Sequence, residues 1–176
     1  GFLRSFSKDD QLLAGFISGS DSNFEQLIGR HSTQLFNTAL HITGSLNLAE
    51  EVVTNVFYRA YQEIDTISVR TTIKIWLYRI TVEAALEAMN SLKELEVIEI
   101  NSLMEHKLCA LQDNELLIGR QMLIDAMHSL PSEYKCVFVL KDIIGFTRPE
   151  VAEVLEISDL EVQARLHRAR RMILRI

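Results

Sequence analysis

The sequence has few of the residues that interrupt helices. Only two prolines and seven glycines occur among its 176 residues. Proline lacks a backbone donor and glycine raises the entropic cost of order, so their scarcity favours long helices with short connections. With a hydrophobic content of 48%, a chain of this length can form one domain or two small ones, each with its own core.

Other absences exclude classes of protein. The only cysteines, Cys109 and Cys136, lack metal-ligand spacing, so we expect no metal and reduced, buried thiols in a cytoplasmic protein. There is no apolar run of membrane-spanning length and no visible signal peptide, so no membrane insertion is expected. The five histidines are scattered, and no phosphate loop or nucleophile motif occurs. We therefore expect neither an enzyme nor a cofactor.

The clearest motif occupies the C-terminal segment 147–175. Apolar residues recur at helical spacing over 148–155 and again over 159–173. Thr147 and Glu150 have the spacing of a capping box, and either Ser158 or Asp159 can cap the second run. Two short helices joined by a tight turn predict a helix-turn-helix.

The second of these helices is rich in arginine after its last acid, Glu161. The arginines are Arg165, Arg168, Arg170, Arg171 and Arg175. Such a helix can lie in a major groove and contact phosphates. Arginines near a helix C-terminus also complement the helix dipole, so DNA binding and a plain helical hairpin both stay open. The net charge is −6 and the segment 148–164 is acidic, so any basic face must be local.

Apolar stripes predict further helices ahead of this motif. They cover residues 9–17, 22–42, 48–64, 73–92, 115–130 and 131–144. Asp21 or Ser22 is expected to cap the second helix, and Asn47 the third. Trp76 lies on the apolar side of the fourth helix and is expected to anchor the core. The acidic, irregular segment 93–114 predicts a linker. The fold class is therefore all-α, with two small helical domains, the C-terminal one containing the helix-turn-helix.

The order of these parts resembles the bacterial RNA polymerase sigma factors of the extracytoplasmic-function (ECF) type, in the sigma-70 family. The matching segments are AEEVVTNVFYRAYQEID at 49–65, WLYRI at 76–80, LPSEYKCVFVLKDIIGFTRPEVAEVLEIS at 130–158 and VQARLHRARRMILR at 162–175. Each segment alone is a weak signal, but their combination in this order is specific.

The resemblance implies a sigma factor that binds core RNA polymerase and directs promoter-specific initiation. Residues 1–92 would form a region 2-like domain, 93–114 the linker, and 115–176 a region 4-like domain. Polymerase-binding residues would be Glu50, Glu51, Thr54, Asn55 and Arg59. Residues at the −10 element would be Asp65, Thr66, Arg70, Thr71 and Lys74. Residues at the −35 element would be Lys141, Gln163, Ala164, Arg165, His167, Arg168 and Arg171. Besides polymerase and promoter DNA, the implied partner is an anti-sigma factor.

The sequence departs from the family pattern where DNA would pass. Family members carry a basic cluster after the WLYRI segment, whereas here Lys93 is the only base in MNSLKELEVIEI at 89–100. The second helix of the motif begins with Asp159 and Glu161, which add negative charge. A second hypothesis therefore stays open: a degenerate sigma-like protein that binds polymerase or an anti-sigma partner without strong DNA recognition. The sequence names neither the target promoters nor the inducing signal.

Overall fold

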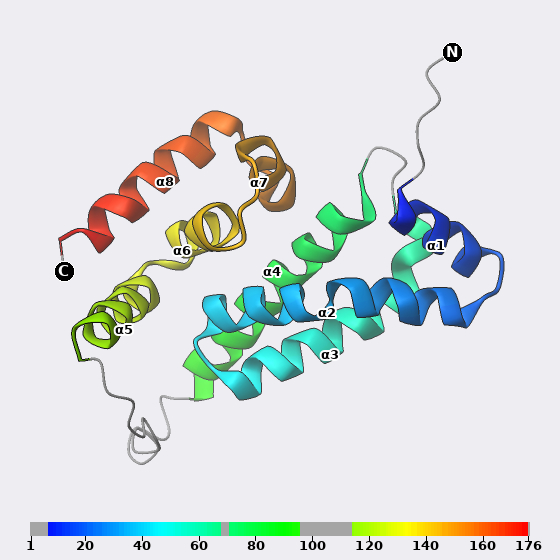
Figure 1. Ribbon diagram of the computed structural model, residues 1–176, viewed down its shortest axis with the longest axis horizontal. Coiled ribbons are helices and arrows are strands. Elements are labelled where there is room, and N and C mark those ends of the chain that lie inside the picture. The colour runs from blue at the N-terminus through cyan, green and yellow to red at the C-terminus, as the bar shows by residue number, and fades with distance from the viewer. Residues whose placement is uncertain (1–6, 68–70, 96–113, 176) are drawn as a thin grey trace.

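The computed structural model describes residues 7–67, 71–95 and 114–175, and within these ranges it contains helices and no strand. The first unit holds α1 (Lys8–Ile17), α2 (Asp21–Thr43), α3 (Leu46–Glu63), the 3-10 turn η1 (Ile64–Thr66) and α4 (Ile73–Leu95). The second holds α5 (Asn114–Ser129), α6 (Ser132–Phe138), the π-helical turn η2 (Val139–Ile143), α7 (Arg148–Leu155) and α8 (Asp159–Ile173). Figure 1 shows the two helical units. The predicted all-α class with a C-terminal helix-turn-helix is confirmed.

The core of the first unit lies between α2, α3 and α4, which pack against one another (Figure 1). The predicted stripe of α3 is inside it, since Val52, Val56 and Ala60 are buried. Leu77 of α4 is also fully buried. Trp76, expected as a core anchor, is only partly buried, although it packs against this core.

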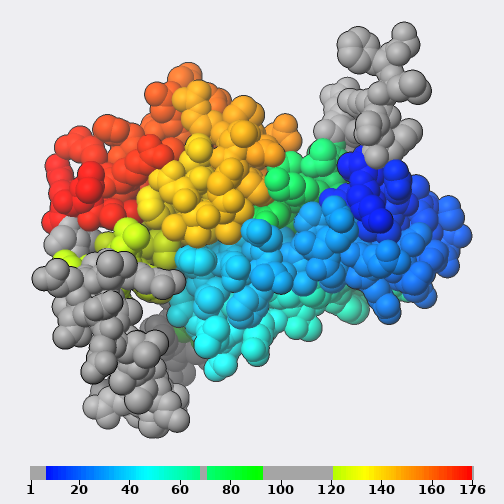
Figure 2. Space-filling model, in the orientation of Figure 1, coloured from blue at the N-terminus to red at the C-terminus, as the bar shows by residue number. Residues whose placement is uncertain are grey.

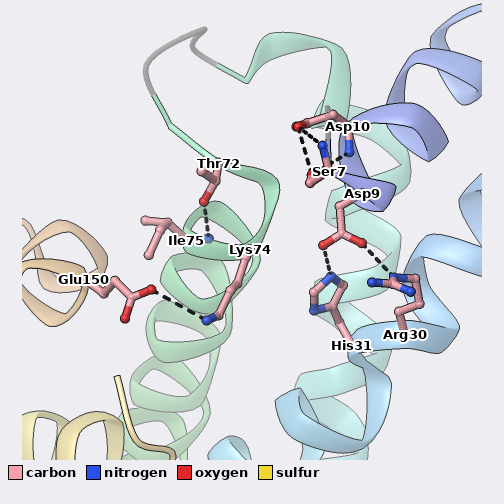
Figure 3. Close-up of polar contacts among 9 residues, drawn as sticks. All are labelled: Ser7, Asp9, Asp10, Arg30, His31, Thr72, Lys74, Ile75 and Glu150. Atoms are coloured by element: carbon pink, nitrogen blue, oxygen red, sulfur yellow. Dashed lines mark hydrogen bonds and ion pairs between the residues drawn. The ribbon is translucent and has the colours of Figure 1, made fainter. Parts of the chain in front are cut away.

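Polar contacts fasten α1 to the unit. Ser7 and Asp10 form a capping box at the start of α1. Arg30 Nε of α2 donates to Asp9 Oδ1 at 2.8 Å, and His31 Nε2 lies 2.9 Å from Asp9 Oδ2 (Figure 3). One carboxylate therefore holds two successive residues of α2, which fixes where α1 crosses it.

Two predicted N-caps are wrong. Helix α3 is capped by Ser45, whose hydroxyl accepts the Leu48 N–H at 3.4 Å, so Asn47 lies inside the first turn. Helix α2 begins at Asp21 after Ser20, not after Asp21 or Ser22. An N-cap residue must have an extended backbone, and Ser45, with φ −133° and ψ 127°, has that conformation.

The two units pack directly against each other. Phe146, which follows η2, is buried, and its ring centroid lies 4.6 Å from that of Tyr78 in α4. Burial raises the pKa of the Tyr78 hydroxyl to about 12. The buried apolar residues of both units belong to one continuous cluster. Figure 2 shows the atoms of α6 and α7, in yellow and orange, pressed against those of α2 and α4.

The region between the units is the predicted linker, 93–114. Its central part lies outside the described residues. The bounds 1–92, 93–114 and 115–176 therefore stay a prediction. No helix in the described part of the chain is both long enough and apolar enough to cross a bilayer.

Candidate nucleic-acid and polymerase interfaces

The helix-turn-helix begins with the predicted capping box. The Thr147 hydroxyl accepts the Glu150 N–H at 3.4 Å, and Glu150 Oε2 accepts the Thr147 N–H at 2.8 Å. This backbone hydrogen bond is the largest cause of the lowered pKa of Glu150. Pro149 lies in the first turn, where its missing N–H has no helical partner to lose. These contacts set the start of α7.

The corner between α7 and α8 is made without glycine. Glu156 ends α7 with φ 54° and ψ 39°, the left-handed conformation that usually selects glycine. The N–H of Ile157 bonds back to the carbonyl of Ala152 at 3.1 Å. Ser158 then caps α8 by accepting the Glu161 N–H at 3.1 Å, which confirms one of the two predicted caps.

Helix α8 presents a hollow to solvent. Its inner residues Val162, Leu166 and Ala169 are buried against the unit. The hollow has a volume of about 680 Å³ and is lined by Lys141, Arg148, Leu160, Gln163, Ala164, Leu166, His167 and Arg170. Four of the residues expected at the −35 element thus meet in one place: Lys141, Gln163, Ala164 and His167. Glutamine can bond an adenine edge, and lysine can meet a phosphate.

The predicted arginines do not all share this hollow. Arg165 pairs with Glu161 one turn earlier and lines a different groove, which faces α4. Arg168 Nη1 donates to the hydroxyl of Tyr134 in α6 at 3.2 Å, while its own side chain stays exposed. Arg171 is exposed on the last turn of α8. Arg168 and Arg171 are therefore exposed on α8 outside the lining of the hollow, whereas Arg165 lines the inter-unit groove.

An arginine that the sequence did not single out lies beside the recognition helix. Arg148 Nη2 pairs with Asp159 Oδ2 at 3.0 Å, and its Nη1 donates to Gln163 Oε1 at 3.3 Å. The acid at the start of α8 is thus neutralised, and Gln163 is oriented from α7. The sequence signal for this contact is the short turn between the two helices, which brings Arg148, at the start of α7, near the first two turns of α8.

The residues expected at the −10 element are divided. Asp65 and Thr66 are exposed on η1, and Thr71 is partly buried just before α4. Arg70 lies outside the described residues. Lys74, in the first turn of α4, faces the second unit, with its Nζ 3.7 Å from Glu150 Oε1 (Figure 3). The described residues therefore do not form one surface in this arrangement.

The outer face of α3 gathers most of the residues expected to bind polymerase. Glu50, Glu51, Thr54 and Asn55 are exposed on its first three turns. Arg59 instead turns sideways, 3.3 Å from Glu83 of α4 and 3.9 Å from Glu63. Tyr58, 64% exposed, accepts a hydrogen bond from Gln62 at 2.8 Å on the same face. Tyr58 was not among the residues predicted to bind polymerase. It follows Glu51 by seven residues, two helical turns, and this spacing could have placed it on the same face.

No group of His, Cys, Asp and Glu side chains in the described ranges could hold a metal ion. The architecture defines the class, an all-helical protein carrying a helix-turn-helix. Residues 27–94 match the family model described as sigma-70 region 2, and residues 120–173 match the one described as sigma-70, region 4. The chain belongs to the sigma-70 family of RNA polymerase sigma factors, and within it to the ECF type.

Curated relatives and solved structures agree with this assignment. ECF RNA polymerase sigma factor SigW of Bacillus subtilis is 24% identical over 163 residues, covering 86% of this chain and 87% of its own. ECF RNA polymerase sigma-E factor of Haemophilus influenzae is 23% identical, covering 94% and 93%. The fold is shared with CnrH in complex with the cytosolic domain of CnrY, at a TM-score of 0.72, 23% identity and 95% coverage of both chains. It is also shared with RpoE in complex with the anti-sigma factor NepR from Bartonella quintana, at a TM-score of 0.67, 18% identity, and 86% and 94% coverage.

Proposed function

We propose that this chain is a sigma factor that binds core RNA polymerase and directs initiation at a specific set of promoters. The single observation that carries the proposal is the outward hollow of α8, where Lys141, Gln163 and His167 meet on a capped helix-turn-helix. A helix of this kind enters a major groove with its N-terminal half. In the cytoplasm, α8 would read the −35 element while the outer face of α3 docks on the polymerase.

The contacts divide into positioning and reading. Gln163 has the amide that can bond the two edge atoms of adenine, so it is the candidate for base readout. Lys141 lines the same hollow, and Arg168 and Arg171 are exposed further along α8. These three cations would contact phosphates, which carry no sequence information. Exposed Leu160, at the start of α8, is suited to an apolar contact with a thymine methyl group.

The acidic residues of 148–164 argue less strongly against DNA binding than the sequence alone suggested. Glu150 and Glu156 pair with cations of α4, on the side away from the α8 hollow. Asp159 pairs with Arg148, and Glu161 pairs with Arg165. Because these acids are partnered by cations, they repel phosphate less than free carboxylates would. This supports an active sigma factor over a degenerate one.

The test is reconstitution. The purified chain would be combined with core polymerase and a pool of randomised promoters, and the transcripts sequenced. We expect a small set of promoters with two enriched elements to emerge, and none without the chain. Binding to core polymerase with no promoter enrichment would instead identify the degenerate, non-reading protein.

We also propose an anti-sigma partner, on the analogy of the RpoE–NepR complex. The groove facing α4 has a volume of about 300 Å³, an apolar floor including Val82 and Leu86, and charged residues at its edge. An amphipathic helix fits such a groove. The partner would be captured from source cells and must inhibit the reconstituted transcription. Reversing the edge charge with Glu133→Lys should weaken that inhibition, and undiminished inhibition would argue against this groove.

A further inference from the structure

One arginine joins α7 to α8 with both arms of its guanidinium group. Arg148, the first residue of α7, pairs through Nη2 with Asp159 Oδ2 at 3.0 Å and donates through Nη1 to Gln163 Oε1 at 3.3 Å. Asp159 and Gln163 are four residues apart, so they share one face of α8. A planar guanidinium with forked donors suits two such acceptors at once, whereas a lysine ammonium is a compact point charge on a flexible stem.

The carboxylate of Asp159 depends on this arginine. Its Oδ1 atom is shielded from solvent and accepts no hydrogen bond from any described residue, so Arg148 supplies the ion pair that compensates its charge. The charge of Arg148 is in turn balanced by Asp159. Arg148 is therefore better suited to hold its two partners on α8 than to contact a phosphate.

The donors of Arg148 also fix how the Gln163 amide is turned. A guanidinium group has donors and no acceptor, so it can bond this amide only through Oε1. The other branch of the amide, Nε2, is left for DNA, because Gln163 is exposed and lines the α8 hollow. A two-bond contact with adenine needs Oε1 to accept from N6 while Nε2 donates to N7. That contact would break the bond to Arg148 or share the oxygen between two donors.

The base edges in the major groove differ in what they offer to an N–H donor. Guanine presents two neighbouring acceptors, N7 and O6, whereas adenine presents one acceptor beside a donor. Cytosine presents a donor, and thymine presents one acceptor beside its methyl group. The two hydrogens of an amide nitrogen are therefore satisfied most fully by guanine.

We propose that Arg148 determines the base specificity of α8 by holding Oε1 of Gln163, so that Nε2 faces the groove and Gln163 reads guanine instead of adenine. This inference rests on the proposed function, because Gln163 reads a base only if α8 enters a major groove. Arg148 acts through Gln163 and is a positioning residue. It gives a role to an arginine at the edge of the hollow whose charge is already paired within the protein.

The test measures binding of the full chain, assembled with core polymerase, to a promoter selected by reconstitution. Gln163→Ala first locates the base that Gln163 contacts, as the position where preference relaxes. All four base pairs at that position are then compared for the original chain, Arg148→Lys and Arg148→Ala. The matched control is Arg175→Lys, the same chemical change beyond the end of α8 and outside the hollow. Circular dichroism checks that each variant is folded.

We expect the original chain to bind the guanine promoter about tenfold more tightly than the adenine promoter. Arg148→Lys keeps a positive charge beside Asp159, so overall affinity and its salt dependence should change little, while the preference for guanine over adenine is lost. Arg148→Ala should lose the same preference and also weaken binding to all sequences, because the unpaired Asp159 repels phosphate. A purely structural role of Arg148 would weaken all sequences alike. Arg175→Lys should keep the base preference of the original chain.

Three results would overturn this inference while leaving the sigma-factor proposal intact. They are a preference of the original chain for any base other than guanine, a guanine preference that survives in either Arg148 variant, and a loss of preference at a different position, which would mean that Arg148 reads a base itself. If polymerase with the original chain selects no promoter at all, the proposed function fails. The inference then falls with it, because no base is read.

Discussion

Arg170 and Asp142 form a two-pronged ion pair between α8 and η2. Arg170 Nε donates to Asp142 Oδ2 at 2.8 Å, and its Nη2 donates to Oδ1 at 2.7 Å. Arg170 borders the hollow, but both of these donors are already bonded to Asp142. Arg170 therefore holds the recognition helix α8 against η2 of the same unit. The hydrogen bond to Asp142 also raises the pKa of Arg170.

This pair predicts a modest loss of stability. Arg170 is 52% exposed, so solvent screening limits the pair to about 0.5–1 kcal/mol. A double-mutant cycle with Arg170→Ala and Asp142→Ala, followed by urea unfolding, should recover that coupling. Arg171→Ala, at an exposed neighbouring position, should stay within about 0.5 kcal/mol of the original chain. A coupling energy of zero would mean that the two side chains do not hold α8 in solution.

Two glycines, one inside α2 and one just after it, predict changes of opposite sign. Gly44 ends the helix with φ 70°, and a Cβ there would lie 3.1 Å from Cε1 of His128. Gly44→Ala should therefore lower the free energy of unfolding by about 1–2 kcal/mol. Gly29 lies within the helix with open space around it, so Gly29→Ala should raise that free energy by about 0.5–1 kcal/mol. Urea unfolding of both variants checks the signs. An equal change in the free energy of unfolding would contradict the left-handed backbone conformation of Gly44.

The hollow of α8 predicts two kinds of DNA effect. Gln163→Ala should relax preference at one base of the −35 element, at a cost of about 1–3 kcal/mol. Arg168→Ala should weaken binding to all DNA sequences alike, and should reduce the slope of log affinity against log salt concentration by about one. Holoenzyme binding to a selected promoter and its single-base variants, over a range of salt, separates the two. If Gln163→Ala behaves like Arg168→Ala, then Gln163 does not read a base.

The outer face of α3 predicts a polymerase contact centred on Tyr58. Exposed Tyr is enriched among the residues that dominate protein interfaces. Tyr58→Ala and Glu51→Arg should each weaken binding to core polymerase by tenfold or more, with little change in melting temperature. Arg59 is a poorer probe, because its pairs with Glu63 and Glu83 stabilise the fold. Glu25→Arg, on the exposed side of α2, is the control, and an equal loss there would point to nonspecific charge effects.

The Cys136 thiol predicts a loss of stability at alkaline pH. Burial raises its pKa from 9.0 to about 11. Because the folded state retains the proton longer than the unfolded state, this contribution is complete below pH 9. It falls as the pH rises to 11, by about 1–3 kcal/mol in total.

The measurement is urea unfolding of the chain with Cys136 and with Cys136→Ala, at several pH values. Both would carry Cys109→Ser, so that only one thiol titrates. The difference in stability between the two should shrink above pH 9. A difference independent of pH would mean that the thiol is not desolvated by the fold.

Local signals in the sequence were sufficient where one residue dominated. Thr147 with Glu150, and Ser158 before an acidic first turn, set α7 and α8 at their predicted positions. They failed where polar neighbours had similar capping ability. Ser45 and Asn47 can both cap a helix, and the left-handed backbone of Gly44 decides between them by turning the chain before Ser45.

The sites were predictable only within single helices. Gln163, Ala164 and His167 share one side of α8, so their spacing alone brings them together. The partners of Lys74 and Arg79 could not be predicted in this way. Arg79 contacts the carbonyl of Glu153, 74 residues away, and the periodicity of one helix carries no information about which other helix lies against it.

The π-helical turn η2 determines in which direction the side chains that follow it point, relative to those of α6. The N–H of Ile144 bonds to the carbonyl of Val139, five residues back, so this turn contains one residue more than an α-helical turn. Deleting one residue there would rotate everything that follows by about 100° relative to α6. Lys141, inside this turn, borders the α8 hollow, while Phe146, beyond it, is buried against Tyr78, so the deletion would change the angle between these two side chains. A shortened chain would therefore keep its helices but misdirect either the recognition surface or the seam between the units.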